Sequence, residues 1–280
     1  MSNMNFTIFY KYSFFIAITI MLAACGSSTT EEDDLADTDA STVIQKEKNN
    51  KVQKIFAAIP SQSETSGLLE DAGAKYNADF LNPVENTSKY SSIKARALNL
   101  GVYGIDLGVT NIFDQTQESM LYLRCTNKMA TSLGISGAFD ENMSERIDAN
   151  SDNKDSLLAI ITESYRNADN YLQENGQAGV SSLMVAGGWI EGLYIAAHIA
   201  TTAKNEAIMN KIGGEKATLE NLISLLEGYK TETEGVEDIL TNLNELKTIY
   251  DSTSEQITPE QFKQIADKVT EIRTKIIQQV

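Results

Sequence analysis

Apolar residues recur three and four positions apart through most of the chain beyond residue 41, which is the spacing of helices that bury one face. This spacing predicts helices over residues 42–58, 88–113, 115–133, 139–147, 154–174, 217–229 and 235–250, a further one after Ser63, and a last one from Thr258. Residues 180–212 form one long apolar run. No stretch shows the strict alternation of a strand. The sequence therefore predicts an all-α domain over residues 41–280, a bundle or array of about eight to ten helices.

Local signals support several of these boundaries. Asn82-Pro83 marks a turn within a loop over residues 77–87. Thr258-Pro259-Glu260 is a typical helix start, with threonine as the cap and proline in the first turn. Apolar residues then follow at helical spacing, namely Phe262, Ile265, Val269, Ile272 and Ile276. The last helix is thus expected to bury one face.

The most apolar segment, residues 184–199, raises the question of a membrane span. It is shorter than the roughly 20 residues that a spanning helix needs. It also contains Glu191 and His198, and ionisable residues are costly inside a bilayer. We expect a buried core helix.

Two segments, 100–112 and 186–199, resemble each other. Aligning Ile105 with Ile190, an offset of 190 − 105 = 85 residues, places Asp106 beside Glu191. Two related helical halves are one organisation consistent with this match. Each segment also carries three glycines, which are Gly101, Gly104, Gly108 and Gly187, Gly188, Gly192. Because glycine costs about 1 kcal/mol inside a helix, such clusters predict that another helix approaches closely.

The first 25 residues have a different character. Lys11 precedes an apolar stretch over residues 12–22 and the small residues Ala23 and Ala24, which is typical of a secretory signal. Leu22-Ala23-Ala24-Cys25 resembles the lipobox of bacterial lipoprotein precursors. The resemblance implies that residues 1–24 are a signal peptide and that Cys25 carries acyl chains, its thiol joined to diacylglycerol. The alternative is an ordinary secretory signal with a chance cysteine.

The resemblance also suggests a location. In lipoproteins generally, aspartate after the cysteine favours the inner membrane; here Gly26 follows, so we expect the cell envelope and its outer membrane, on the periplasmic face or the cell surface. Residues 25–40 are small, polar and acidic, so they are expected to form a disordered tether that lifts the domain off the membrane. The expected partner is then membrane lipid, through the acyl chains on Cys25.

Charge and composition exclude several other functions. The chain has 23 basic and 39 acidic residues, and removing residues 1–24 with their one basic group leaves 22 − 39 = −17. That charge repels phosphate backbones and argues against nucleic acid. With Cys25 acylated, Cys125 has no disulfide partner, and a buried inert thiol is expected. A single histidine, His198, excludes a multi-histidine metal site, so no metal or cofactor is predicted.

Polar side chains on the two glycine-bearing segments are the candidate ligand-binding residues. Spacings of three and four put them in two stripes: Arg96, Asn99, Tyr103, Asp106 and Thr110 on one segment, and Glu191, Tyr194 and His198, with Trp189 beside them, on the other. If both stripes face inward, they could line a cleft for a small polar ligand. The alternatives are a solvated helix face or a buried hydrogen-bonded network.

Three functions were compared on this basis. The first is a non-enzymatic, lipid-anchored scaffold or protein-binding module. The second is a solute- or glycan-binding lipoprotein with a polar cleft between the helices at 88–113 and 180–205. The third is a hydrolase that uses Asp106 and Glu191 as an acid/base pair. The chain contains no glycine-rich phosphate loop, Gly-x-Ser-x-Gly or His-Glu-x-x-His motif, and the acidic loop at 148–155 lacks the EF-hand pattern. The sequence therefore favours a binding role over catalysis.

Overall fold

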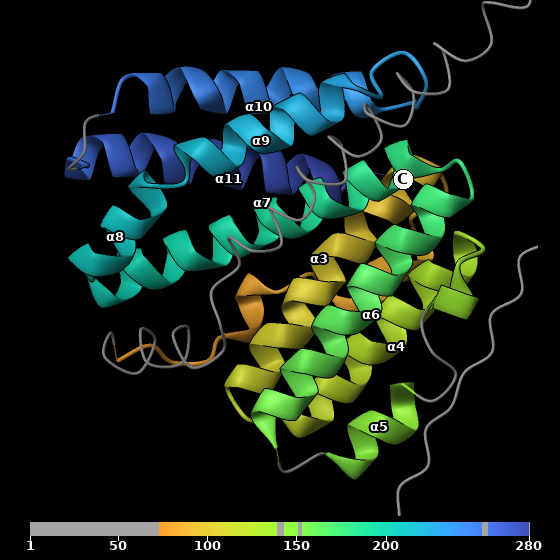
Figure 1. Ribbon diagram of the computed structural model, residues 1–280. Helices are drawn as coiled ribbons and strands as arrows, with labels where there is room; N and C mark the ends of the chain where they lie inside the picture. Colours follow the sequence, from red (N-terminus) through yellow and green to blue (C-terminus); the bar gives the residue numbers. More distant parts are fainter. Residues whose placement is uncertain (1–72, 139–142, 151–152, 254–256, 280) are drawn as a thin grey trace, which may run out of the picture. The chain divides into compact units, whose positions relative to one another are not determined.

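The computed structural model describes residues 73–138, 143–150, 153–253 and 257–279, and these residues fold into helices joined by short loops (Figure 1). Within them there are nine α-helices, three short 3-10 helices and no strand, which confirms the all-α prediction. The signal peptide, Cys25, the tether at 25–40 and the helices expected at 42–58 and after Ser63 lie outside the described residues.

The α-helices are α3 (Ile93–Ile112), α4 (Thr116–Ser132), α5 (Met143–Ala149), α6 (Lys154–Glu174), α7 (Ala178–Ala203), α8 (Glu206–Gly213), α9 (Lys216–Glu227), α10 (Val236–Asp251) and α11 (Pro259–Ile277). The 3-10 helices are η1 (Ala78–Phe80), η2 (Val84–Ser88) and η3 (Ser136–Ala138).

Side-chain caps fix the starts of several helices. The Thr258 hydroxyl accepts from the Gln261 backbone, and the Gln261 side chain bonds back to the Thr258 backbone, a complete capping box. This confirms the predicted start of α11. Asn153 caps α6 by accepting from the Ser156 backbone. Ser92 caps α3 in the same way, so the helix predicted from residue 88 begins later, because residues 84–88 form η2.

The apolar run at 180–212 contains two helices: the helix expected over 180–205 is α7, which ends at Ala203, and α8 follows it. The chain ends α7 at Lys204, whose φ of 51° is left-handed, and Asn205 then caps α8. Glycine and asparagine are the usual residues at a left-handed helix end, so a lysine there gave no sequence signal. The break makes α7 and α8 separate helices that contact each other.

Helices α3 and α7 touch through their backbones. A Cβ added at Gly101 would lie 2.0 Å from the Met184 carbonyl oxygen, and one added at Gly187 would lie 2.0 Å from that of Leu98. No side chain fits at either site, which confirms that the glycine clusters mark a close helix approach. Figure 1 shows the two helices starting side by side and diverging toward their C-terminal ends.

These two glycine contacts are reciprocal. Gly101 and Gly187 differ by 187 − 101 = 86 positions, and their partners Leu98 and Met184 also differ by 184 − 98 = 86. The offset that pairs Ile105 with Ile190 is one residue shorter. The related-halves hypothesis therefore stays a prediction, with local two-fold-like packing at this one crossing.

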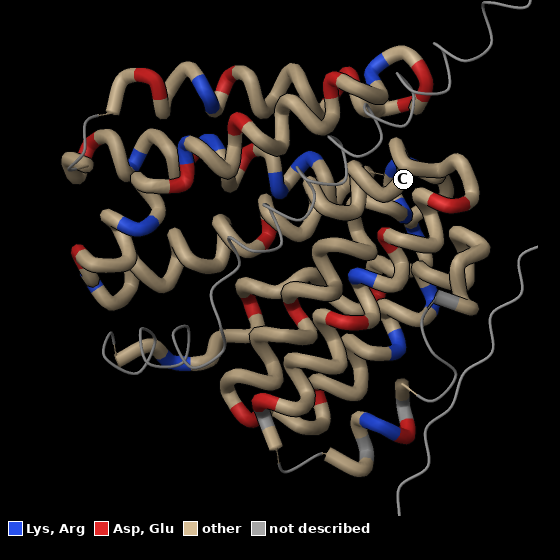
Figure 2. The backbone as a smooth tube through the Cα atoms, viewed as in Figure 1, with Lys and Arg blue, Asp and Glu red and all other residues tan. Residues whose placement is uncertain are grey.

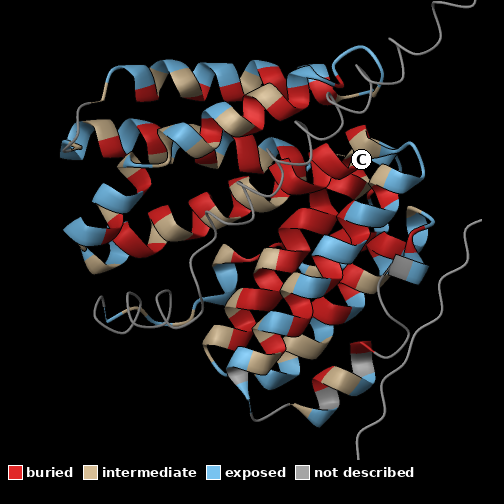
Figure 3. Cartoon of the chain, in the orientation of Figure 1, coloured by how far each residue is buried: buried red, intermediate tan, exposed pale blue. Residues whose placement is uncertain are grey.

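Helix α7 is the core helix of the described domain. It is the one helix in the described residues that is long and apolar enough to cross a membrane, and 72% of its most apolar window is buried inside the protein. It contacts α3, α6, α8, α9 and α11, and its exposed surface is small (Figure 3). Its only charged residue is Glu191, whereas charges are frequent along α9, α10 and α11 (Figure 2). This burial agrees with the expected core helix.

Candidate functional site

A buried ion pair joins α7 to α11. Both Glu191 carboxylate oxygens accept hydrogen bonds from Arg273, at 3.0 Å from Nε and 3.0 Å from Nη2. Glu191 is fully buried and Arg273 is 6% exposed. The guanidinium also donates to the Phe80 carbonyl at 3.1 Å and lies 4.5 Å from the centroid of the Tyr194 ring. The guanidinium is thus held by three hydrogen bonds and one aromatic ring.

A second carboxyl group, Asp106 on α3, lies against this pair. Its Oδ2 accepts from the Asn82 backbone at 3.1 Å, and its carboxyl interacts electrostatically with that of Glu191. Burial, together with the neighbouring Glu191 charge, raises the pKa of Asp106 well above its usual value. Burial also raises the pKa of Glu191, but Arg273 opposes that shift. These directions favour a protonated Asp106 beside an ionised Glu191, which leaves one negative and one positive charge in the network.

Amide and hydroxyl groups extend the network to the loop before α3. The Asn82 side chain donates to Tyr90 at 2.9 Å and to Asn99 at 3.0 Å, and Asn99 donates to the Ile276 carbonyl at 3.1 Å. The Tyr103 hydroxyl donates to the Pro83 carbonyl at 3.0 Å. The network therefore holds the loop, α3, α7 and α11 in one register.

The structure brings most of the sequence-predicted residues together. Tyr103, Asp106, Glu191 and Tyr194 are all buried around this network, with the partners given above. The ring of His198 lies 4.2 Å from that of Tyr194, centroid to centroid and tilted by 46°, with its Nδ1 3.0 Å from the Tyr194 carbonyl. The polar side chains of both stripes face inward. Of the alternatives considered, a ligand cleft, a solvated helix face and a buried hydrogen-bonded network, the buried network matches this arrangement. The solvated face does not.

Sequence reasoning missed Arg273 and Asn82. The sequence predicts only a turn at Asn82, and no local pattern indicates its hydrogen-bond partners, which are distant in the sequence. A local sequence signal did exist for Arg273. It lies four residues after Val269 and three before Ile276, on the apolar face of α11. A charged residue at such a position needs a buried partner of opposite charge.

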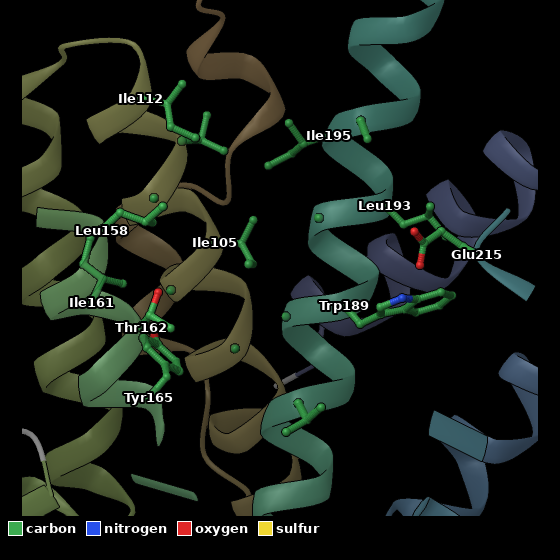
Figure 4. A pocket seen from close by; sticks show the side chains of 18 of the residues that line it. Ile105, Ile112, Leu158, Ile161, Thr162, Tyr165, Trp189, Leu193, Ile195 and Glu215 are labelled. Atoms are coloured by element: carbon green, nitrogen blue, oxygen red, sulfur yellow. The ribbon is translucent and has the colours of Figure 1, made fainter. Parts of the chain in front are cut away.

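Trp189 lies elsewhere, in an apolar pocket on α7. The pocket has a volume of about 340 Å³ and is lined by α3, α6, α7, α8 and α9. Figure 4 shows Ile105, Ile112, Leu158 and Ile161 on one side of α7, with Trp189, Leu193 and Glu215 on the other. Two lining glycines leave space in the pocket. A Cβ added at Gly192 would meet no atom of the described residues within 4 Å, and one added at Gly108 would meet only Leu158, at 3.8 Å.

Other chemistry has little support in the described part of the chain. No group of three or more His, Cys, Asp or Glu side chains there could hold a metal ion. Cys125 is buried, and burial raises the pKa of its thiol to about 11, which suppresses the nucleophilic thiolate. The apolar pocket is therefore the candidate ligand site in the described part of the chain.

No family model matches this chain, and no curated protein or solved structure matches it either. The fold and the site define a helical array with a buried ion network around Glu191 and Arg273 and an apolar pocket along α7.

Proposed function

We propose that this chain is a non-enzymatic, lipid-anchored protein of the cell envelope that binds an elongated apolar ligand, such as an acyl chain, in the pocket on α7. The observation that carries the proposal is the pocket itself. Ligand sites typically measure about 300–1,000 Å³ and are lined mainly by apolar side chains with a few polar groups. Here the polar contribution comes from few residues, among them Thr162, Lys211 and Glu215.

The length of the pocket supports an extended ligand. Its α3 wall runs from Gly101 to Phe113, twelve residue steps, which at 1.5 Å per residue is about 18 Å. Helices α3 and α7 meet at Gly101 and diverge beyond it, and lining residues follow α3 along this length. A chain-like ligand fits that shape better than a compact one.

A polar ligand has less support. Asp106, Glu191 and Tyr194 do not line the pocket, and their polar groups face Arg273, Asn82 and one another. A glycan would need those groups free, and a hydrolase would need them beside substrate. The scaffold or protein-binding role expected from the sequence rests on the lack of catalytic motifs, whereas the pocket gives the apolar ligand a physical site.

Lipid anchoring is supported by the lipobox-like Leu22-Ala23-Ala24-Cys25. Two or more acyl chains anchor durably, whereas one chain binds only marginally. Gly26 favours the outer membrane over the inner membrane. In bacteria, labelled palmitate should enter the wild-type protein but not Cys25→Ala. Equal labelling of the two would remove the anchor from the proposal.

Ligand binding is tested with anthroyloxy-labelled palmitate and the unlipidated chain from residue 26 onward. Leucine at Gly192 occupies the open space of the pocket, so Gly192→Leu should bind the probe at least about ten-fold more weakly, a change of about 1.4 kcal/mol. The matched control is Gly137→Leu, where an added Cβ also meets no described atom within 4 Å but which is not a lining residue. Equal affinity in all three proteins, or no binding by the wild type, would refute the ligand function.

A further inference from the structure

The two charged residues that line the apolar pocket lie close together, where α8 is joined to α9. Lys211 is in the last turn of α8, and Glu215 is the residue directly before α9. The chain keeps helical turns between them, since the Gly214 amide donates four residues back at 3.1 Å and the Glu215 amide donates three residues back at 3.2 Å. Residues four apart on a helical turn share one face, with about 5–6 Å between their Cβ atoms. One cation and one anion therefore lie side by side at the pocket.

The fold does not use these two charges. Among the described residues, neither side chain makes a hydrogen bond or an ion pair, with the other or with a third residue. A lysine four positions before a glutamate is the less favourable order for an ion pair along a helix. Lys211 is exposed and Glu215 is half-buried, so a ligand in the pocket can reach both groups.

The wall of the pocket on α3 has the opposite character. From Gly101 to Phe113, every lining residue on this helix is glycine or apolar. Figure 4 shows Ile105 on one side of α7, and Glu215 together with Trp189 on the other. A lipid in the pocket would therefore lay its acyl chain along α3 and its polar head against the α8–α9 junction.

The charge pair discriminates between polar heads. An anionic head would be attracted by Lys211 and repelled by Glu215, in a chain whose net charge is already −16. An uncharged head would pair with neither group. A phosphoethanolamine head matches both at once, because its phosphate accepts from an ammonium group and its own ammonium donates to a carboxylate. Complementary charges of this kind contribute specificity more than affinity.

We propose that the ligand is a single-chain zwitterionic lipid, a lysophospholipid whose phosphate pairs with Lys211 and whose ammonium pairs with Glu215. The inference rests on the ligand function proposed above and names the head group that the acyl chain carries. Thr218, half-buried on the first turn of α9, also lines the pocket, and its hydroxyl can donate to the phosphate. A cavity of about 340 Å³ suits one acyl chain rather than two.

The first experiment uses Trp189, the one tryptophan of the chain, which lines the pocket. Lysolipids with a dibromostearoyl chain should quench its fluorescence when they bind the unlipidated chain from residue 26 onward. At about 0.15 M salt, which screens distant charges, the wild type should bind the phosphoethanolamine lipid about three-fold more tightly than the phosphoglycerol lipid with the same chain. Equal affinities would overturn the inference and leave the ligand function standing. No quenching by either lipid would refute the ligand function, and the inference with it.

The second experiment assigns the preference to the charge pair. Glu215→Gln should abolish it, whereas Glu227→Gln, which removes the same charge from an exposed position of α9 outside the lining, should keep it. Lys211→Gln should weaken binding of both phospholipids about three-fold and leave that of a dibromostearoyl monoacylglycerol, which carries no charge, unchanged. A preference that survives in Glu215→Gln, or an equal loss for all three lipids in Lys211→Gln, would overturn the inference.

Discussion

Arg273 and Glu191 lie 82 residues apart in the sequence and meet through two hydrogen bonds of 3.0 Å in the interior of the protein. The pair connects the last helix, α11, to the core helix, α7. A buried ion pair is weak evidence of net stabilisation, because removing both charges from water costs much of what their attraction returns. Removing only one partner is different, because the other charge then stays buried without compensation.

Glu191→Gln should therefore lower the free energy of unfolding by about 3–5 kcal/mol, as measured by urea denaturation. The amide cannot offer two anionic oxygens to Arg273, and the guanidinium stays charged because arginine does not deprotonate in proteins. Asp267→Asn is the control, since the Lys263–Asp267 pair is 66% and 64% exposed and its loss should be nearly neutral. Similar small effects for both variants would mean that the buried pair does not hold α11 in place.

The raised pKa of Asp106 makes stability depend on pH in a specific direction. The folded protein holds this proton more tightly than the unfolded chain does, so its contribution is complete below the ordinary pKa of 3.8. It is lost as pH rises through the raised value, at up to about 1.4 kcal/mol per pH unit between the two. Asp106→Asn keeps the shape without the titrating proton, and should lose less stability than the wild type over this range.

The measurement is the difference in unfolding free energy between wild type and Asp106→Asn, from urea denaturation at a series of pH values above 3.8. Exposed acids cancel in this difference because both proteins contain them. A constant difference across the series would show that Asp106 is ionised in the folded state, and that Glu191 holds no proton from it.

Much of the fold followed from local pattern. Capping chemistry placed the start of α11 at Thr258, and glycine spacing predicted the backbone contact at Gly101 and Gly187. The helix expected over 180–205 ends close to where α7 ends, but the left-handed conformation of Lys204 at that end could not be predicted, because its residue type disfavours it.

The site was harder to predict because its partners are distant in the sequence. Helical spacing put Asp106 and Glu191 on polar stripes without deciding whether the stripes face inward, and only tertiary packing brings Asn82 and Arg273 to them. The apolar pocket left no signal at all: its lining residues look like ordinary core positions. The glycines that keep it open, such as Gly192, look like those that permit close packing. The sequence alone does not distinguish a glycine that allows a neighbouring helix to pack closely from a glycine that borders an open pocket.

Cys125 should be unreactive in the folded protein. In the chain from residue 26 onward it is the only thiol, it is 5% exposed, and its pKa is raised to about 11 by burial. At pH 8 only about one thiol in a thousand would be thiolate, the reactive form. Ellman's reagent should therefore react at the rate of unfolding, and rapidly in urea. Immediate reaction of the native protein would show that the thiol is accessible.

Substitution by alanine should distinguish a glycine at the close contact of α3 and α7 from a glycine that borders the pocket. Gly101→Ala puts a methyl group 2.0 Å from the Met184 carbonyl, where backbone must move, so we expect destabilisation by about 3 kcal/mol or more. Gly192→Ala meets no described atom within 4 Å and gains up to about 1 kcal/mol of helix propensity, so it should be stabilising. Both free energies come from urea denaturation of single variants. Because alanine has the same intrinsic propensity at both positions, the difference between the variants isolates the packing of α3 against α7. Equal effects would mean that the two helices can separate at Gly101 without cost, and that the contact there does not set the width of the pocket beyond it.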